Sequence, residues 1–183
     1  MRLLRLLAVC ILFPLTFLLS GCGSTTMLEE YSFGYTQLTS ENSEVFLMTP
    51  FQLARANRQT GNGYMYIGND VHINLMAVAE PVSQEGRENL TPKALAGMSQ
   101  SMLEKTTDIS NLQTKVYDTT VKGQAAVSVD NTYEEPLNGK KTSLVVRSIF
   151  FEDNDQVWHV MYMYKSGDAL GKEVTDYIFG KIK

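Results

Sequence analysis

Residues 142–165 read TSLVVRSIFFEDNDQVWHVMYMYK, and this stretch decides the fold. Two apolar runs, residues 144–151 and 157–165, flank the turn sequence DNDQ at 153–156, which is the pattern of two antiparallel strands joined by a hairpin. In residues 144–151 both alternating sets of side chains are largely apolar. A strand with two apolar faces is covered on both sides, so we expect it at the centre of a sheet.

Further signals extend this antiparallel pattern towards the N-terminus. Asn138-Gly139 predicts a tight hairpin between residues 125–134 and 142–152, because both residue types tolerate the positive φ angles of a type I′ turn. Residues 71–79 alternate with period two, which predicts another half-buried strand.

Two helices complete the pattern. Thr91 followed by Pro92 is typical of a helix start, with Thr91 as N-cap and Pro92 at the first helical position. Asp168 is the expected N-cap of a final helix whose apolar stripe runs to Ile182. Helices combined with a mainly antiparallel sheet define the α+β class.

The order and lengths of these elements resemble the Mog1/PsbP-like superfamily, and in particular its bacterial DcrB-like lipoproteins, across residues 45–183. The resembling features include the helix from Pro92, the segment VKGQAA at 121–126 and the hairpin strands at 144–151 and 158–164. The resemblance implies an α/β/α sandwich with a sheet of about six strands between helices. Characterised members of the superfamily are mostly binding or assembly factors and share no catalytic residues, so the resemblance implies no catalytic site.

The N-terminus resembles a bacterial lipoprotein signal. Arg2 and Arg5 form a positive region, and the apolar run at 6–19 is shorter than the ~20 residues that a membrane-spanning helix needs. The run ends in LSGC at 19–22, which resembles the lipobox and implies cleavage before Cys22 and lipidation of its thiol. We therefore predict a membrane anchor made of lipid on Cys22, with palmitate among its chains; an ordinary secretory signal with a coincidental cysteine is the alternative.

The residue after the lipidated cysteine bears on location. In Gram-negative lipoproteins that resemble this chain, Asp at that position retains the protein at the inner membrane, whereas here it is Gly23. This difference favours the outer membrane in a Gram-negative envelope. A Gram-positive source would place the domain on the outer face of the cell membrane.

The chain divides into three predicted parts. Residues 1–21 form the signal peptide, and residues 22–43, rich in Ser, Thr and Glu, are expected to be the lipidated N-terminus and a tether. The segment contains Tyr31, Phe33 and Tyr35, and the sequence leaves open whether these three side chains pack on the domain. Residues 44–183 suit one domain, beginning at 45–53 with an edge strand or the entry to a strand, because this stretch contains Pro50.

Composition narrows the function classes. The 44% hydrophobic content is that of an ordinary folded protein, and the net charge of −4 without a basic cluster makes nucleic acid a poor partner. Only Cys10 and Cys22 supply thiols, one in the signal and one at the lipidation position. Disulfides, thiol catalysis and cysteine metal sites are therefore not expected in the mature chain.

Candidate chemical groups are few. His72 and His159 lie on expected strands without the spacing of a metal site, so we interpret both as structural and predict no metal and no cofactor. Residues 153–155 begin like a calcium loop but lack its glycine and distal glutamate, so a turn is expected. The acidic pairs at 134–135 and 152–153 abut turns and are interpreted as solvated charges.

An aromatic group is the remaining candidate. We expect core packing from this group, and the alternative is an exposed platform for a partner or a glycan. Its members are Tyr64, Tyr66, Trp158, Tyr162 and Tyr164.

These observations favour a non-enzymatic binding or accessory module that is anchored in the cell envelope and acts on an unidentified envelope protein. Two alternatives stay open: an envelope hydrolase that uses a carboxylate site, and a carrier of a small molecule or metal. No catalytic residue is predicted, and Cys22 is the one site residue assigned.

Overall fold

The structure is a computed structural model that describes residues 27–57, 64–83 and 90–183. Cys22 and the predicted signal peptide lie outside the described residues. A 3-10 helix, η1 (Met27–Glu30), belongs to a separate N-terminal unit, and Tyr31–Lys183 forms one compact unit. In the described part of the chain, no helix is long and apolar enough to cross a membrane.

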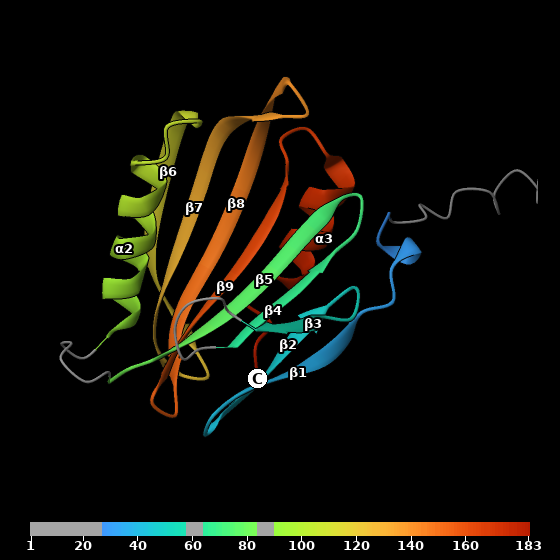
Figure 1. Cartoon of the computed structure of the whole chain (residues 1–183). Helices are drawn as coiled ribbons and strands as arrows, with labels where there is room; N and C mark the ends of the chain where they lie inside the picture. Colours follow the sequence, from blue (N-terminus) through green and yellow to red (C-terminus); the bar gives the residue numbers. More distant parts are fainter. Residues whose placement is uncertain (1–26, 58–63, 84–89) are drawn as a thin grey trace, which may run out of the picture. The chain divides into compact units, whose positions relative to one another are not determined.

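The compact unit is built on a seven-stranded sheet in which every neighbouring pair is antiparallel (Figure 1). In spatial order its strands are β3 (Ala54–Asn57), β4 (Tyr64–Asn69), β5 (Ile73–Pro81), β9 (Gln156–Lys165), β8 (Lys140–Asp153), β7 (Gln124–Leu137) and β6 (Ser110–Val121). The α+β class is confirmed, but the expected six strands are too few. The strand predicted to be central, β8, lies between β9 and β7 and is indeed covered on both faces.

Three two-residue turns set the register of β6 to β9. Asn138 and Gly139 both have positive φ (51° and 74°), as the type I′ prediction requires, and they join Leu137 to its partner Lys140. The turns at 122–123 and 154–155 also have positive φ at both residues. The turns at 138–139 and 154–155 confirm the two hairpins predicted from the sequence.

The two helices lie on opposite faces of the sheet (Figure 1). Helix α2 (Pro92–Glu104) places Ala96 against Val127, Val129 and Phe150 on one face. Helix α3 (Ala169–Ile178) packs on β9 and β5 on the other face, where Tyr162 and Trp158 are fully buried. The predicted caps are confirmed, because the Thr91 and Asp168 side chains accept hydrogen bonds from the first turns of α2 and α3.

Helix α3 ends earlier than predicted. Ile178 is its last residue, and Gly180, with a φ of 72°, turns the chain away from the helix. Ile182 therefore lies outside the helix and forms a bridge with Leu47 instead.

A second, two-stranded sheet lies on the α3 face. It consists of β1 (Gly34–Ser40) and β2 (Ser43–Thr49), and its Ser43 Oγ accepts a hydrogen bond of 2.8 Å from Trp158 Nε1. The tether predicted at 22–43 is therefore wrong for β1, which pairs along its whole length. The strand predicted at 45–53 ends at Thr49 and belongs to this small sheet, not to the edge of the main one.

Candidate functional site

One end of the α3 face carries a polar cleft. Because α3 packs on β9 and β5, the β6 side chains Lys115 and Tyr117 on this face stay exposed. The cleft has a volume of about 320 Å³. Its lining residues are Gln113, Lys115, Tyr117, Asp130, Thr132, Val145, Arg147, Tyr164, Lys172 and Asp176.

The register of the sheet places three charges of the cleft in one row. Lys115 of β6 is opposite Asp130 of β7, which is opposite Arg147 of β8. Facing side chains of antiparallel strands are close neighbours, so a positive, a negative and a positive side chain follow one another across the sheet. The Arg147 Nε donates to Asp130 Oδ1 at 3.3 Å, which fixes the inner half of this row.

Helix α3 closes the charge network. Arg147 Nη1 donates to Asp176 Oδ1 at 2.8 Å, and Lys172 Nζ donates to Asp176 Oδ2 at 2.6 Å. The hydrogen bond to Asp176 raises the pKa of the Lys172 ammonium. The Arg147 guanidinium also lies over the Phe179 ring, 3.9 Å from its centre. Arg147 thus has a fixed position, held between two carboxylates and an aromatic ring.

This arrangement suits binding. Both carboxylates of the cleft, Asp130 and Asp176, already accept hydrogen bonds from Arg147, so they hold its guanidinium group in place. On the open side, Lys115 is exposed and Tyr117 keeps 47% of its surface accessible. An exposed aromatic ring beside a charged side chain offers a partner both an apolar surface and hydrogen bonds.

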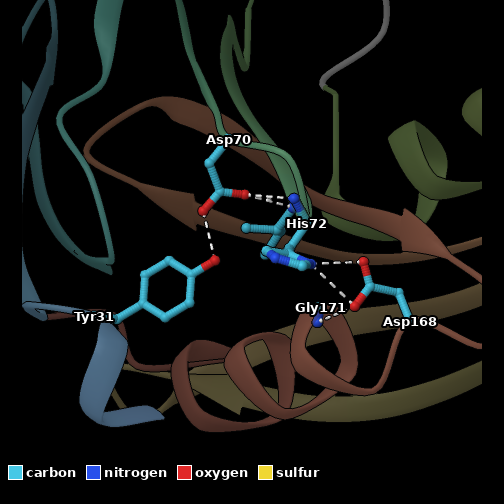
Figure 2. Close-up of polar contacts among 6 residues, drawn as sticks. Tyr31, Asp70, His72, Asp168 and Gly171 are labelled. Atoms are coloured by element: carbon cyan, nitrogen blue, oxygen red, sulfur yellow. Dashed lines mark hydrogen bonds and ion pairs between the residues drawn. The ribbon is translucent and has the colours of Figure 1, made fainter. Parts of the chain in front are cut away.

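His72 lies in the turn before β5 and not, as was expected for it, on a strand. Figure 2 shows its ring against Asp168, with Nδ1 2.9 Å from Oδ2. The same carboxylate accepts the Gly171 amide at 2.9 Å and so caps α3. Burial alone would raise the pKa of Asp168, but the hydrogen bonds from Gly171 and His72 lower it. His72 therefore joins the β4–β5 turn to the start of α3.

Asp70 holds the other side of this turn (Figure 2). Its Oδ1 accepts the backbone amides of His72 and Ile73, both at 2.8 Å, and its Oδ2 accepts the Tyr31 hydroxyl at 2.6 Å. Tyr31 was among the residues predicted to lie in the tether. One aromatic residue of that segment is thus tied to the domain.

His159 lies on β9, as predicted, and is half-buried. It lies on the α2 face, where its ring stacks on Phe150 with 4.1 Å between centres, and its Nε2 is 3.1 Å from Ser148 Oγ. Burial lowers the pKa of His159 to about 4. Among the described residues, no group of three or more His, Cys, Asp or Glu side chains is arranged to hold a metal ion.

The acidic pairs do not face each other. Neighbouring residues of a strand point to opposite faces, so Glu134 and Glu135 of β7 are separated by the sheet, as are Glu152 and Asp153 of β8. Glu134 pairs with Lys141 at 2.6 Å, and this hydrogen bond lowers its pKa. The residues at 153–155 close the β8–β9 turn, as expected.

The aromatic group is mostly core. Trp158 and Tyr162 have no exposed surface, and Tyr66 and Tyr164 keep 5% and 7%. Tyr64 is partly exposed, and the Arg55 guanidinium lies 3.6 Å from the centre of its ring. The core interpretation is confirmed for four members, and they do not form an exposed platform.

Sequence reasoning missed the cleft. Its residues come from β6, β7, β8, β9 and α3, and no local motif connects them. One signal was available in the sequence: Arg147 is the single charged residue within the apolar run at 144–151. A charge inside a strand that is covered on both faces requires partners, and Asp130 and Asp176 provide them.

Comparison with known proteins gave no family. No family model matches the chain, and no curated protein matches it either. The chain is similar to the solved structure of PA94, a protein of unknown function from Pseudomonas aeruginosa, with 17% identity, coverage of 78% of this chain and 91% of that chain, and a TM-score of 0.39. It is also similar to LpqN, which is involved in cell envelope biogenesis of Mycobacterium tuberculosis, with 8% identity, coverage of 85% and 93%, and a TM-score of 0.48. The Mog1/PsbP-like assignment accordingly stays a prediction.

Proposed function

We propose that this chain is a lipid-anchored cell-envelope protein that binds another envelope component through the polar cleft between β6, β7 and α3. The observation that carries the proposal is the cleft itself, with Arg147 fixed between Asp130 and Asp176. Fixed charges beside exposed side chains give a partner a preformed surface to recognise.

The anchor part of the proposal rests on the sequence. A lipobox-like LSGC at 19–22 implies that Cys22 carries the acyl chains, and two or three chains hold a protein stably at a membrane. With Gly23 next to it, we propose the outer membrane in a Gram-negative envelope and the outer face of the cell membrane otherwise.

The anchor is tested with a Cys22→Ala variant of the full chain expressed in its host. We expect it to lose incorporation of labelled palmitate and to accumulate as the uncleaved precursor, seen as a higher mass. Cys10→Ala, inside the predicted signal, is the matched control and should be labelled like the wild type. If Cys22→Ala is processed normally and stays tightly in the membrane fraction, the anchor account is wrong.

The binding role is tested by purifying the native lipoprotein with its partners from detergent-solubilised envelopes. Lys172→Glu reverses a charge of the cleft wall, and Lys165→Glu makes the same change at an exposed residue outside the cleft. We expect a partner that copurifies with the wild type and with Lys165→Glu, and that is lost with Lys172→Glu. Recovery of no partner, together with robust hydrolysis in a substrate screen, would favour an enzyme instead.

A further inference from the structure

Strand β6 is open along its edge, and from Lys115 to Asp118 its side chains are exposed on both faces. It ends the main sheet, and among the described strands it pairs with β7 alone. Helix α3 packs on β9 and β5, and α2 packs mainly on β7, β8 and β9. Helix α2 also contacts β6 at Thr114, whose hydroxyl accepts a hydrogen bond of 2.7 Å from Gln100 Nε2. Val116 keeps 61% of its surface accessible and Tyr117 keeps 47%, on opposite faces. After a bulge near Ser110, the pairing runs unbroken from Gln113 to Val121.

The turn after β6 shows which backbone groups point outward. Lys122 and Gly123 form a two-residue turn with positive φ at both positions, and Val121 pairs with Gln124 across it. The pair that flanks such a turn is hydrogen-bonded, and bonded pairs alternate with non-bonded ones along the strand. Counting back from Val121, the N–H and C=O groups of Thr114, Val116, Asp118 and Thr120 point away from the sheet.

On the α3 face, the charge row ends at this open edge. From the edge inward it reads Lys115, Asp130, Arg147. The next position outward would lie directly opposite Lys115 on an added strand. An acidic residue there would continue the alternation of charge, whereas a basic one would oppose Lys115.

On the α2 face, the outer two residues of the neighbouring row are apolar. Val116 lies opposite Val129, which is buried. Nearby, an apolar cleft of about 310 Å³ lies between the start of α2 and the β6–β7 hairpin, with Pro92, Ala125 and Val127 in its lining. A β-branched residue opposite Val116 would extend this apolar surface.

We propose that β6 accepts an extended segment of a partner protein as an eighth strand of the main sheet, with an acidic residue opposite Lys115 and a β-branched residue opposite Val116. Main-chain hydrogen bonds to the outward groups of β6 hold the segment, and the two alternating side chains select it. This inference rests on the proposed binding role and adds the chemistry of the partner.

A second copy of the chain is a poorer occupant. In a symmetric antiparallel pair of β6 strands, facing residues share one face of the sheet, so Lys115 can face only odd-numbered residues. The odd-numbered residues of β6 are Asn111, Gln113, Lys115, Tyr117, Thr119 and Val121, and none is acidic. The charge row therefore selects a different chain.

The proposed side chains of the partner segment are tested by panning a library of random peptides of about 12 residues against the full-length lipoprotein in detergent. We expect enriched sequences to carry Asp or Glu next to Val, Ile or Thr. The Lys115→Glu variant should enrich Lys or Arg at the same position. No enriched consensus, or the same consensus with both proteins, would overturn the proposal.

The proposed main-chain hydrogen bonds to β6 are tested with the best enriched peptide, labelled with a fluorophore. Methylation of its backbone nitrogens at alternate residues should weaken binding about tenfold in one register and little in the other, because one set of N–H groups faces β6. Val116→Pro, which removes an outward N–H, should weaken binding similarly; its circular dichroism reports whether the fold is kept. Equal binding of both methylated peptides would contradict strand addition.

Failures of the two proposals are distinguishable. If Lys172→Glu abolishes partner recovery while panning gives no consensus, the cleft binds its partner without strand addition, and only the present inference fails. If sedimentation shows a dimer of the wild type that Val116→Pro dissociates, the occupant is a second copy, and the partner proposed here is wrong.

Discussion

Strands β9 and β6 belong to the same sheet and occupy opposite situations in it. In β9, Trp158 and Tyr162 are buried under α3 and the small β1–β2 sheet, and His159 is half-buried on the α2 face. In β6, Tyr117 and Val116 are exposed on the two faces. Both strands carry aromatic and β-branched residues, so residue type does not separate them. The difference lies in which strand the helices cover.

This comparison separates stability from binding. Substitutions in β9 should lower the free energy of unfolding, because they remove buried contacts. Substitutions of exposed β6 side chains such as Tyr117 should leave that free energy nearly unchanged and reduce binding. Each measurement below compares the two strands or a group that supports one of them.

The largest expected effect is at Trp158. Its side chain is fully buried, so Trp158→Ala should cost about 3–5 kcal/mol of unfolding free energy. Urea denaturation followed by circular dichroism measures this cost. A loss below about 1 kcal/mol would contradict the central role of β9 in the core.

The next effect is a pH dependence from His159. The unfolded pKa of 6.5 falls to about 4 in the fold, so the unfolded chain takes up the proton first. The fold keeps its full stability above about pH 6.5 and loses stability as the pH falls towards 4. The loss of unfolding free energy amounts to about 2 kcal/mol at about pH 5. Urea midpoints at about pH 7.5 and pH 5 should differ less in His159→Gln than in the wild type. An identical difference in both would show that His159 does not carry this dependence.

A smaller effect is expected at Ser43, which supports β9 from β2. Its Oγ accepts the Trp158 indole N–H at 2.8 Å and donates to Asp153 Oδ2 at 2.7 Å. Ser43→Ala leaves a buried N–H without a partner, so it should cost about 1–2 kcal/mol. Ser166→Ala, at an exposed serine, is the control and should change the urea midpoint little. Equal midpoints for both variants would contradict this role.

The smallest effect on stability is expected in β6. Tyr117→Ala should change the unfolding free energy by no more than about 0.5 kcal/mol, since the ring is exposed. The same variant should reduce recovery of the partner from envelopes, because Tyr117 lines the cleft. If the variant is strongly destabilised, or recovers the partner normally, the assignment of binding to β6 and stability to β9 is wrong.

The sequence predicted the parts of the fold that depend on local chemistry. The turns at 138–139 and 154–155 and the caps Thr91 and Asp168 were all expected, because each depends on neighbouring residues. Strand β1 was missed, since what holds it is distant in the sequence: Ser40 Oγ donates to Gln156 Oε1 across 116 positions. The cleft was missed for the same reason, as five separate elements form it.

The most direct test of the central claim places a photo-cross-linker in the living cell. Tyr117 is replaced by p-benzoylphenylalanine in the full chain, and Val71, which is 83% exposed in the β4–β5 turn, is replaced in a second strain. Our account predicts a light-dependent adduct of defined mass from position 117 and none from position 71. Absence of an adduct at 117, or the same adduct from both positions, would contradict the claim that β6 and its cleft form the binding surface.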